Sequence, residues 1–158
     1  MLKLGYPGGP EIDRLAKAGN PCAIDFPRSM LDDPSYNFSF SGVKTSVLYF
    51  VRKTSSYQVE DVCASFQEAV VDVLVGKMLR AAEEYRVKTV SASGGVSINS
   101  RFRDKLAIEC QRRELQLLLV PADLCTDNAA MIAALAFHKQ SGDFSVDVAP
   151  SIGLGVSA

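Results

Sequence analysis

The sequence lacks the residue patterns on which most metal and hydrolytic sites are built. It contains a single histidine, His138, and four cysteines that are far apart, with no pair at C-x-x-C spacing. Zinc sites and redox motifs need closely spaced ligands, and a histidine base needs a positioned partner. These absences argue against a zinc module, a redox protein and a protease. Cys63 and Cys110 lie in helical patterns, so we expect them to be small apolar core residues.

The chain also lacks an excess of charge and any long apolar run. Seventeen Lys and Arg oppose 18 Asp and Glu, so any contact with RNA has to come from a local patch. No apolar run approaches the roughly 20 residues that cross a bilayer, and the N-terminus does not have the form of a secretory signal. We expect a cytoplasmic protein with no membrane partner and, at 47% apolar residues, a core of one domain.

A basic face is one interpretation of eight Lys and Arg residues, but a solvated helix surface is the favoured one, because such helices carry charges by default. The eight are Lys44, Arg52, Lys53, Arg101, Arg103, Lys105, Arg112 and Arg113.

Hydrophobic periodicity predicts a helix-rich α/β fold with a small parallel sheet. The longest helical pattern has one apolar stripe, formed by Val62, Phe66, Ala69, Val70, Val73, Leu74, Met78 and Leu79. Helices are expected over 11–18, 58–85, about 99–113 and 128–140, with helical spacing also from 43 to 51. Strands are expected over 88–93 and 115–121, a short extended segment over 38–41, and a candidate strand near 144–148.

The segment 88–121 reads strand, Gly-Gly turn, helix, strand, with Ser97 or Asn99 as the helix cap. This order predicts a βαβ unit with a right-handed crossover and parallel strands.

Three loops with glycine or acidic residues precede helices and are candidates for a ligand site. They are 8–10 with Asp13 one turn later, 94–95 with Asn99, and 126–128. Ligands of open α/β sheets gather where helix starts offer free N–H groups. Each loop alone is more commonly a turn or a helix cap, but the three together indicate a small-molecule site.

Six motifs in one order, from about residue 3 to residue 148, resemble those of the TsaD family (historically glycoprotease) of tRNA threonylcarbamoyladenosine transferases. They are Gly-Tyr-Pro-Gly-Gly-Pro at 5–10, Phe-Pro-Arg at 26–28, Phe-Ser-Phe-Ser-Gly at 38–42 followed by Lys44-Thr45, Ala-Ser-Phe-Gln-Glu at 64–68, Ser-Gly-Gly-Val-Ser at 93–97 with Asn99, and Cys-Thr-Asp-Asn at 125–128.

The resemblance implies the C-terminal part of such a protein, with residues 1–148 as a helix-rich portion of the C-terminal lobe of the actin-like ATPase (ribonuclease H-like) fold. Upstream strands are expected to be missing, and 149–158 are expected to be a flexible tail. It implies transfer of a threonylcarbamoyl group from threonylcarbamoyl-AMP to N6 of the adenosine beside the anticodon of tRNA. This chain would supply only part of the site and is expected to be inactive alone.

The resemblance also implies roles for single residues. Gly9, Asp13 and Asn99 match positions that contact ATP or the adenylate, and Gly94 and Gly95 are assigned to the same site. Asp127 matches a ligand of the family's divalent metal, iron or zinc. The family's H-x-x-x-H metal ligands and its Ser-Gly-Gly-His-Thr phosphate loop are absent and expected before Met1, so the metal site is incomplete and catalytic residues are unassigned.

The partners implied are an adenylate ligand, tRNA and TsaB-like or TsaE-like proteins. Without upstream strands the sheet would have an open edge, which favours self-association or a partner that covers it. The alternative function is a non-catalytic interaction module, or a truncated paralogue, that docks to a partner of similar fold.

Overall fold

The computed structural model describes residues 2–139, which form two units that meet between Thr126 and Asp127. The first contains four α-helices, two strands and two short 3-10 helices, and the second contains helix α5 (Ala129–Lys139). Among the described residues, no helix is both long and apolar enough to cross a membrane.

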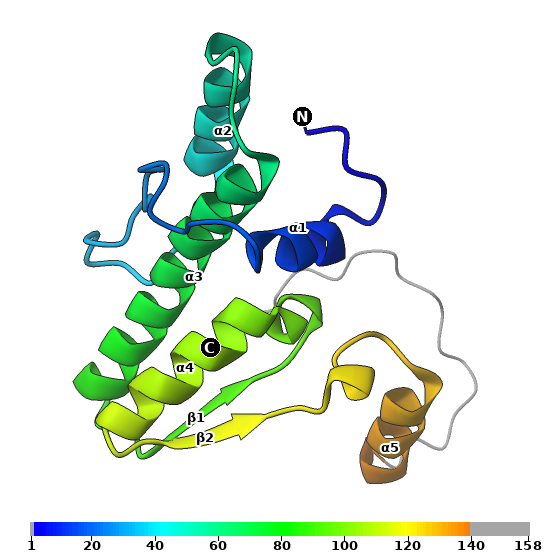
Figure 1. Ribbon diagram of the computed structural model, residues 1–158. Helices are drawn as coiled ribbons and strands as arrows, with labels where there is room; N and C mark the ends of the chain where they lie inside the picture. The colour runs from blue at the N-terminus through cyan, green and yellow to red at the C-terminus, as the bar shows by residue number, and fades with distance from the viewer. Residues whose placement is uncertain (1, 140–158) are drawn as a thin grey trace. The chain divides into compact units, whose positions relative to one another are not determined.

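Helix α3 (Val59–Glu84) is the spine of the first unit, and α1, α2 and α4 all contact it (Figure 1). Half of its 26 residues are buried. They include Val71 and Val75, which lie outside the expected stripe, whereas Phe66 and Leu74 of that stripe are only half-buried. A single apolar stripe therefore understates the burial, because neighbours cover this helix on several sides.

Helix α2 (Ser41–Lys53) packs Val43 and Val47 against the first part of α3, where they meet Val62 and the fully buried Phe26. The extended segment expected over 38–41 was wrong, because residues 38–40 form no strand and Ser41 already begins the helix. The two phenylalanines of the Phe-Ser-Phe pattern stack on each other instead, with ring centroids 6.1 Å apart.

The predicted βαβ unit is confirmed. Strand β1 (Thr89–Ala92) pairs in parallel with β2 (Gln116–Leu119), in a register that sets Val90 beside Leu117. Helix α4 (Ser100–Arg112) connects them and, with the last part of α3, buries Leu106 and Cys110. Cys63 is also buried, so the expectation of apolar core cysteines is confirmed.

Helix α1 (Gly8–Ala16) begins three residues earlier than expected. The helix expected over 128–140 is confirmed as α5. The candidate strand at 144–148 and the expected tail at 149–158 lie outside the described residues, so the predicted boundary after residue 148 stays a prediction.

Two cations on α3 hold the irregular segment 31–38. Lys77 is 1% exposed, and its Nζ donates to the carbonyls of Ser35 at 2.7 Å and Asn37 at 2.9 Å. Arg80 donates to the carbonyls of Leu31 at 3.3 Å and Ser35 at 2.9 Å. Because a buried polar group without a partner is costly, these bonds fix both the cations and the loop.

We expect Lys77→Met to lower the free energy of unfolding by about 1–3 kcal/mol. The variant removes the hydrogen bonds of Lys77 to the carbonyls of Asn37 and Ser35, and of the two only Ser35 keeps Arg80 as a donor. Urea denaturation measures the change, with Lys88→Met at an exposed position as the control. Equal stability of the two variants would contradict this role for Lys77.

Each strand of the sheet pairs along one edge only within residues 2–139, and Leu118 on β2 is 51% exposed. The chain is therefore expected to self-associate, and Leu118→Lys should reduce this because a charge on an edge strand opposes pairing. Light scattering at high protein concentration measures the mass against the 17.1 kDa of one chain. A monodisperse monomer for the unaltered chain would refute the expectation.

Candidate functional site

A cavity of about 670 Å³ lies among α1, α3 and the start of α4. Of the five residues expected to bind a nucleotide, it is lined by Gly9, Asp13, Gly95 and Asn99. Most of its remaining wall is apolar, with Phe66 and Leu74 from α3 and Phe102 from α4. The volume is within the range of small-molecule sites, and apolar walls with a few polar groups are typical of them.

Asp13 and Asn99 meet at the first turn of α4. The carboxylate of Asp13 accepts the backbone N–H of Ser100 at 3.2 Å and its hydroxyl at 2.8 Å. Asn99 is the predicted cap: its Oδ1 accepts the N–H of Phe102 at 2.9 Å, and its Nδ2 donates to the buried Gln67 at 2.7 Å. Side chains thus accept two of the N–H groups at this helix start, so the expectation of free N–H groups is wrong for Ser100 and Phe102.

The start of α1 has no such cap. Pro7 precedes Gly8 and Gly9 and makes no side-chain hydrogen bond to the helix. The first N–H groups of a helix attract anions when no side chain takes them. Gly9 lies on the cavity wall, so an anionic group in the cavity has donors within this turn.

The glycines of the site differ in what they require. Gly94 has φ of +89°, a conformation that favours glycine, and its carbonyl accepts the N–H and hydroxyl of Ser97. It does not line the cavity, so its predicted contact with a nucleotide stays a prediction. A Cβ added at Gly9 or Gly95 would meet nothing within 4 Å, so both positions leave space open in the cavity.

An ion-pair cluster joins α4 to α3. Arg101 binds both carboxylate oxygens of Glu68, at 2.6 and 2.9 Å, and Lys105 bridges Glu68 to Asp72. The hydrogen bond from Arg101, aided by Lys105, lowers the pKa of the Glu68 carboxyl to about 2, although burial opposes this. Arg28 joins the cluster through Asp72 at 2.9 Å.

Arg103 connects the turn after β1 to the end of β2. Its Nε donates to the carbonyl of Ser97 and its Nη2 to the carbonyl of Val120, both at 2.6 Å. The same guanidinium lies 3.5 Å from the thiol of Cys125. The solvated helix surface expected for α4 was therefore wrong for Arg101, Arg103 and Lys105.

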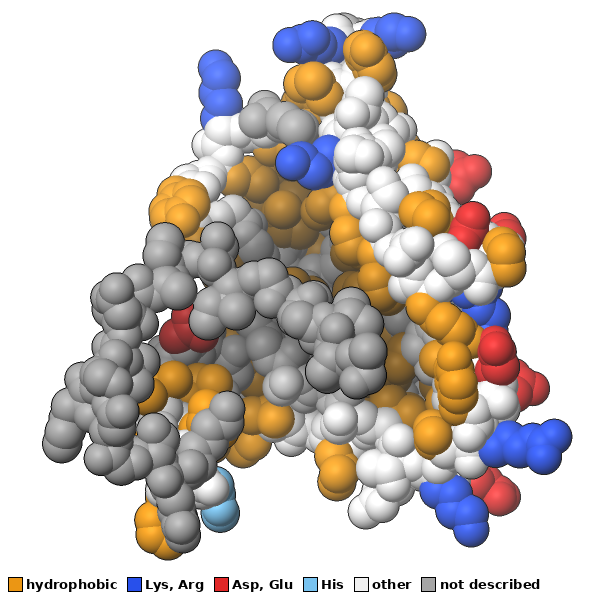
Figure 2. Space-filling view, turned by 180° about the vertical axis from the view of Figure 1, so that it is seen from behind, with side chains coloured by type: hydrophobic (Ala, Val, Ile, Leu, Met, Phe, Trp, Pro, Cys, Tyr) orange, Lys and Arg blue, Asp and Glu red, His pale blue; other side chains and the backbone are white. Residues whose placement is uncertain are grey.

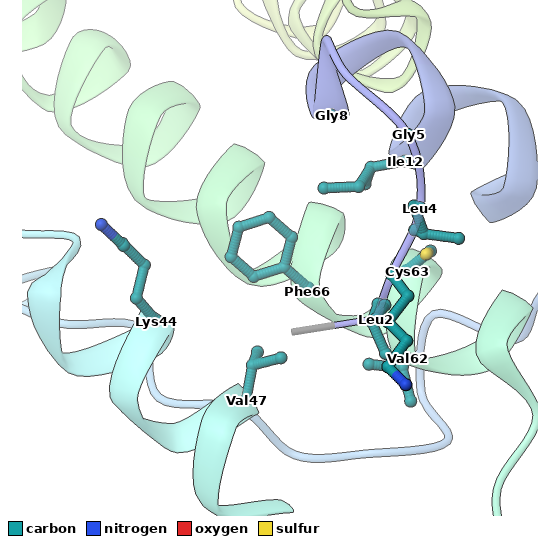
Figure 3. Close-up of a pocket in the computed structure, with 11 residues that line it drawn as sticks. Leu2, Leu4, Gly5, Gly8, Ile12, Lys44, Val47, Val62, Cys63 and Phe66 are labelled. Carbon is teal, nitrogen blue, oxygen red and sulfur yellow. The ribbon is translucent and has the colours of Figure 1, made fainter. Parts of the chain in front are cut away.

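A second cavity of about 500 Å³ adjoins the first and shares Ile12 and Phe66 with it. Figure 3 shows the ring of Phe66 between Val47 of α2 and Ile12 of α1, with Lys44 beside it. The other walls are largely apolar, from Leu2, Leu4 and Val62.

Asp127, the expected metal ligand, is an exposed residue of the second unit. Within residues 2–139 no three His, Cys, Asp or Glu side chains gather closely enough to hold a metal ion. A carboxylate alone does not complete a site for iron or zinc. Among the described residues, Asp127 would therefore supply one ligand of such a metal without completing its site.

Comparison with known proteins agrees with the motifs around the cavity. The model of the TsaD family, described as tRNA N6-adenosine threonylcarbamoyltransferase, matches residues 1–134. The chain belongs to the TsaD family. The two-stranded parallel sheet and its helices are consistent with part of an α/β domain of this family.

Curated TsaD relatives cover most of this chain. The protein named tRNA N6-adenosine threonylcarbamoyltransferase in Thermotoga neapolitana is 51% identical, over 88% of this chain and 42% of the relative. The protein of the same name in Geobacter metallireducens is 48% identical, over 100% of this chain and 46% of the relative. The relative in Clostridium beijerinckii is 43% identical over 98% and 48%. The chain thus spans somewhat less than half the length of these TsaD proteins.

Residue-by-residue reasoning missed Gln67, Ser100 and Arg103. Gln67 interrupts an apolar stripe, which is a signal that a buried polar group needs a partner. Ser100 and Arg103 gave no comparable signal, because their partners are remote in the sequence or are backbone carbonyls.

We expect stability to fall between about pH 5 and pH 2, because Glu68 has its pKa lowered from 4.5 to about 2 in the folded chain. The contribution is fully present above pH 4.5, is lost as Glu68 is protonated, and is about 2–3 kcal/mol. Glu68→Gln should flatten this part of the profile in urea denaturation, and Glu114→Gln at an exposed position should not. Parallel profiles for Glu68→Gln and the unaltered chain would refute the role of this cluster.

Proposed function

We propose that this chain supplies part of the adenylate site of a tRNA N6-adenosine threonylcarbamoyltransferase, with the cavity lined by Gly9, Asp13, Gly95 and Asn99 as that part. The observation that carries the proposal is the meeting of these four residues, from two segments far apart in the sequence, around one cavity.

The lining suits an adenylate. Phe66, Leu74 and Phe102 offer apolar surface to a base, and Asp13 and Asn99 offer oxygen and nitrogen atoms to a ribose. The uncapped start of α1 and the ammonium of Lys17, which forms no ion pair within residues 2–139, favour a phosphate.

The family's activity, with threonylcarbamoyl-AMP as donor and tRNA as acceptor, is part of the same proposal. Gly94 would act by shaping the turn rather than by contact, since it does not line the cavity. Asp127 as a metal ligand, TsaB-like and TsaE-like partners, and a cytoplasmic location also remain proposals from family membership. None of the described residues is assigned as a general base, so we expect no turnover by the chain alone.

Substitutions that fill the cavity test the proposal better than changes at Asp13 or Asn99, which would also uncap α4. Gly9→Leu and Gly95→Leu place side chains in open space, so they should weaken AMP binding about tenfold or more. Gly5→Leu is the matched control, because Gly5 is equally open, lies outside α1 and lines the second cavity only. Titration calorimetry with AMP gives the affinities.

Loss of binding in both variants with binding kept in the control supports the adenylate site. Equal weakening in all three variants would place the ligand elsewhere. No binding of millimolar AMP by the unaltered chain would count against the proposal and would favour an interaction module.

A further inference from the structure

The structure divides the eight basic residues of the sequence pattern into two groups. Those on or next to α4 are already occupied. Arg101 and Lys105 pair with Glu68, Arg103 binds two backbone carbonyls, and Arg112 and Arg113 pair with Glu109. Within residues 2–139 the remaining three, Lys44, Arg52 and Lys53, form no ion pair and are all exposed on α2.

Positive charge is concentrated on α2 although the chain as a whole has a net charge of −1. No Asp or Glu occurs between Asp33 and Glu60, a stretch that carries these three cations. Figure 2 shows Lys and Arg side chains at the upper end of the view, where α2 lies in Figure 1, with no acidic side chain among them. A local field of one sign attracts a polyanion even when net charge is close to zero.

An exposed aromatic ring accompanies the charges. Tyr49 is 55% exposed, and the ammonium of Lys53 lies 5.9 Å from the centroid of its ring. The opposite side of α2 is committed to the core through Val43 and Val47. Cations interleaved with an exposed aromatic side chain are the combination that binds phosphates and stacks bases of unpaired RNA.

The position of α2 links this surface to the candidate adenylate site. Lys44 lines the second cavity, which shares Ile12 and Phe66 with the first (Figure 3). A nucleic acid strand bound along α2 would therefore pass beside the second cavity, which adjoins the one assigned to the adenylate. An apolar protein partner is a poorer match, because the exposed face of α2 carries mainly Ser, Thr, Lys and Arg.

We propose that Lys44, Arg52 and Lys53, with Tyr49, form a contact surface of this chain for the phosphates and an unpaired base of RNA. The proposal rests on the proposed function, because that function makes tRNA the acceptor. It adds the surface that holds the acceptor, for which the comparisons name no residue.

The test is binding of a fluorescein-labelled tRNA anticodon stem-loop to the 158-residue chain, followed by fluorescence anisotropy from low to moderate salt. Lys44→Gln, Arg52→Gln and Lys53→Gln are combined in one variant. The control variant combines Arg86→Gln, Lys88→Gln and Arg112→Gln, which removes three exposed charges near the other end of α3. Circular dichroism verifies that both variants fold.

The α2 variant should bind about tenfold or more weakly, and its slope of log affinity against log salt should be smaller by about 2–3, because each lost phosphate contact removes roughly 0.7–0.9. The control should keep the slope of the unaltered chain. Tyr49→Ala should weaken binding and leave the slope unchanged, since stacking releases no counterions.

Equal losses in the two charge variants, or no binding of the stem-loop by the unaltered chain at low salt, would overturn the proposal. So would binding to phosphatidylserine vesicles that is tighter than binding to RNA. AMP titration of the α2 variant separates this test from the earlier one. Normal AMP binding with weakened RNA binding in the α2 variant supports the RNA surface, whereas normal RNA binding in that variant overturns it. If the unaltered chain binds RNA through α2 but does not bind AMP, only the adenylate site is defeated.

Discussion

The buried polar side chains of α3 are the constraint on which the rest of the first unit depends. Gln67, Glu68 and Lys77 lie on a helix that neighbours cover on several sides, and each is less than 10% exposed. A buried amide, carboxylate or ammonium without a partner would cost more than its packing gives. Among the described residues no buried side-chain nitrogen or oxygen lacks a hydrogen bond. Each of the three thus requires a particular neighbour: Asn99, the pair Arg101 and Lys105, and the loop carbonyls near residue 35.

These requirements also build the candidate site. Because Gln67 holds Asn99 and Glu68 holds Arg101, α4 starts at a fixed point beside α3, and Asp13 then closes the same turn from α1. The residues proposed to face the ligand are therefore structural as well. A ligand that draws Asp13 or Asn99 away from α4 has to replace the hydrogen bonds that it breaks, so binding of the proposed adenylate would be coupled to the placement of α4.

Local rules predicted the elements that depend on neighbouring residues. The period of the apolar residues gave α3 and the βαβ unit, and asparagine before a helix gave the Asn99 cap. Local rules could not predict partners that are far apart in the chain. The hydrogen bond between Asp13 and Ser100, for example, joins residues 87 positions apart. The Phe-Ser-Phe-Ser pattern led to a wrong prediction of an extended segment. The same alternation also places the rings of Phe38 and Phe40 where they stack on each other just before α2. Family motifs gave the candidate site residues, but only the structure shows that Gly94 lies off the cavity wall and that Asp13 and Asn99 are committed to α4.

The basic residues also show the difference between what the local sequence predicts and what tertiary contacts decide. In the sequence, the basic residues of α2 and α4 are of one kind, and helix surfaces carry such charges by default. Folding separates them. Glu68, Asp72 and Glu109 pair with Arg101, Lys105 and Arg112, and backbone carbonyls bind Arg103, whereas none of the described carboxylates pairs with the cations of α2. A cation already bidentate to a carboxylate has little to give to a phosphate, since it would have to exchange one partner for another. The positive charge available to a polyanion is thus what remains after the internal ion pairs have formed. A count of Lys and Arg in the sequence does not predict this remaining charge.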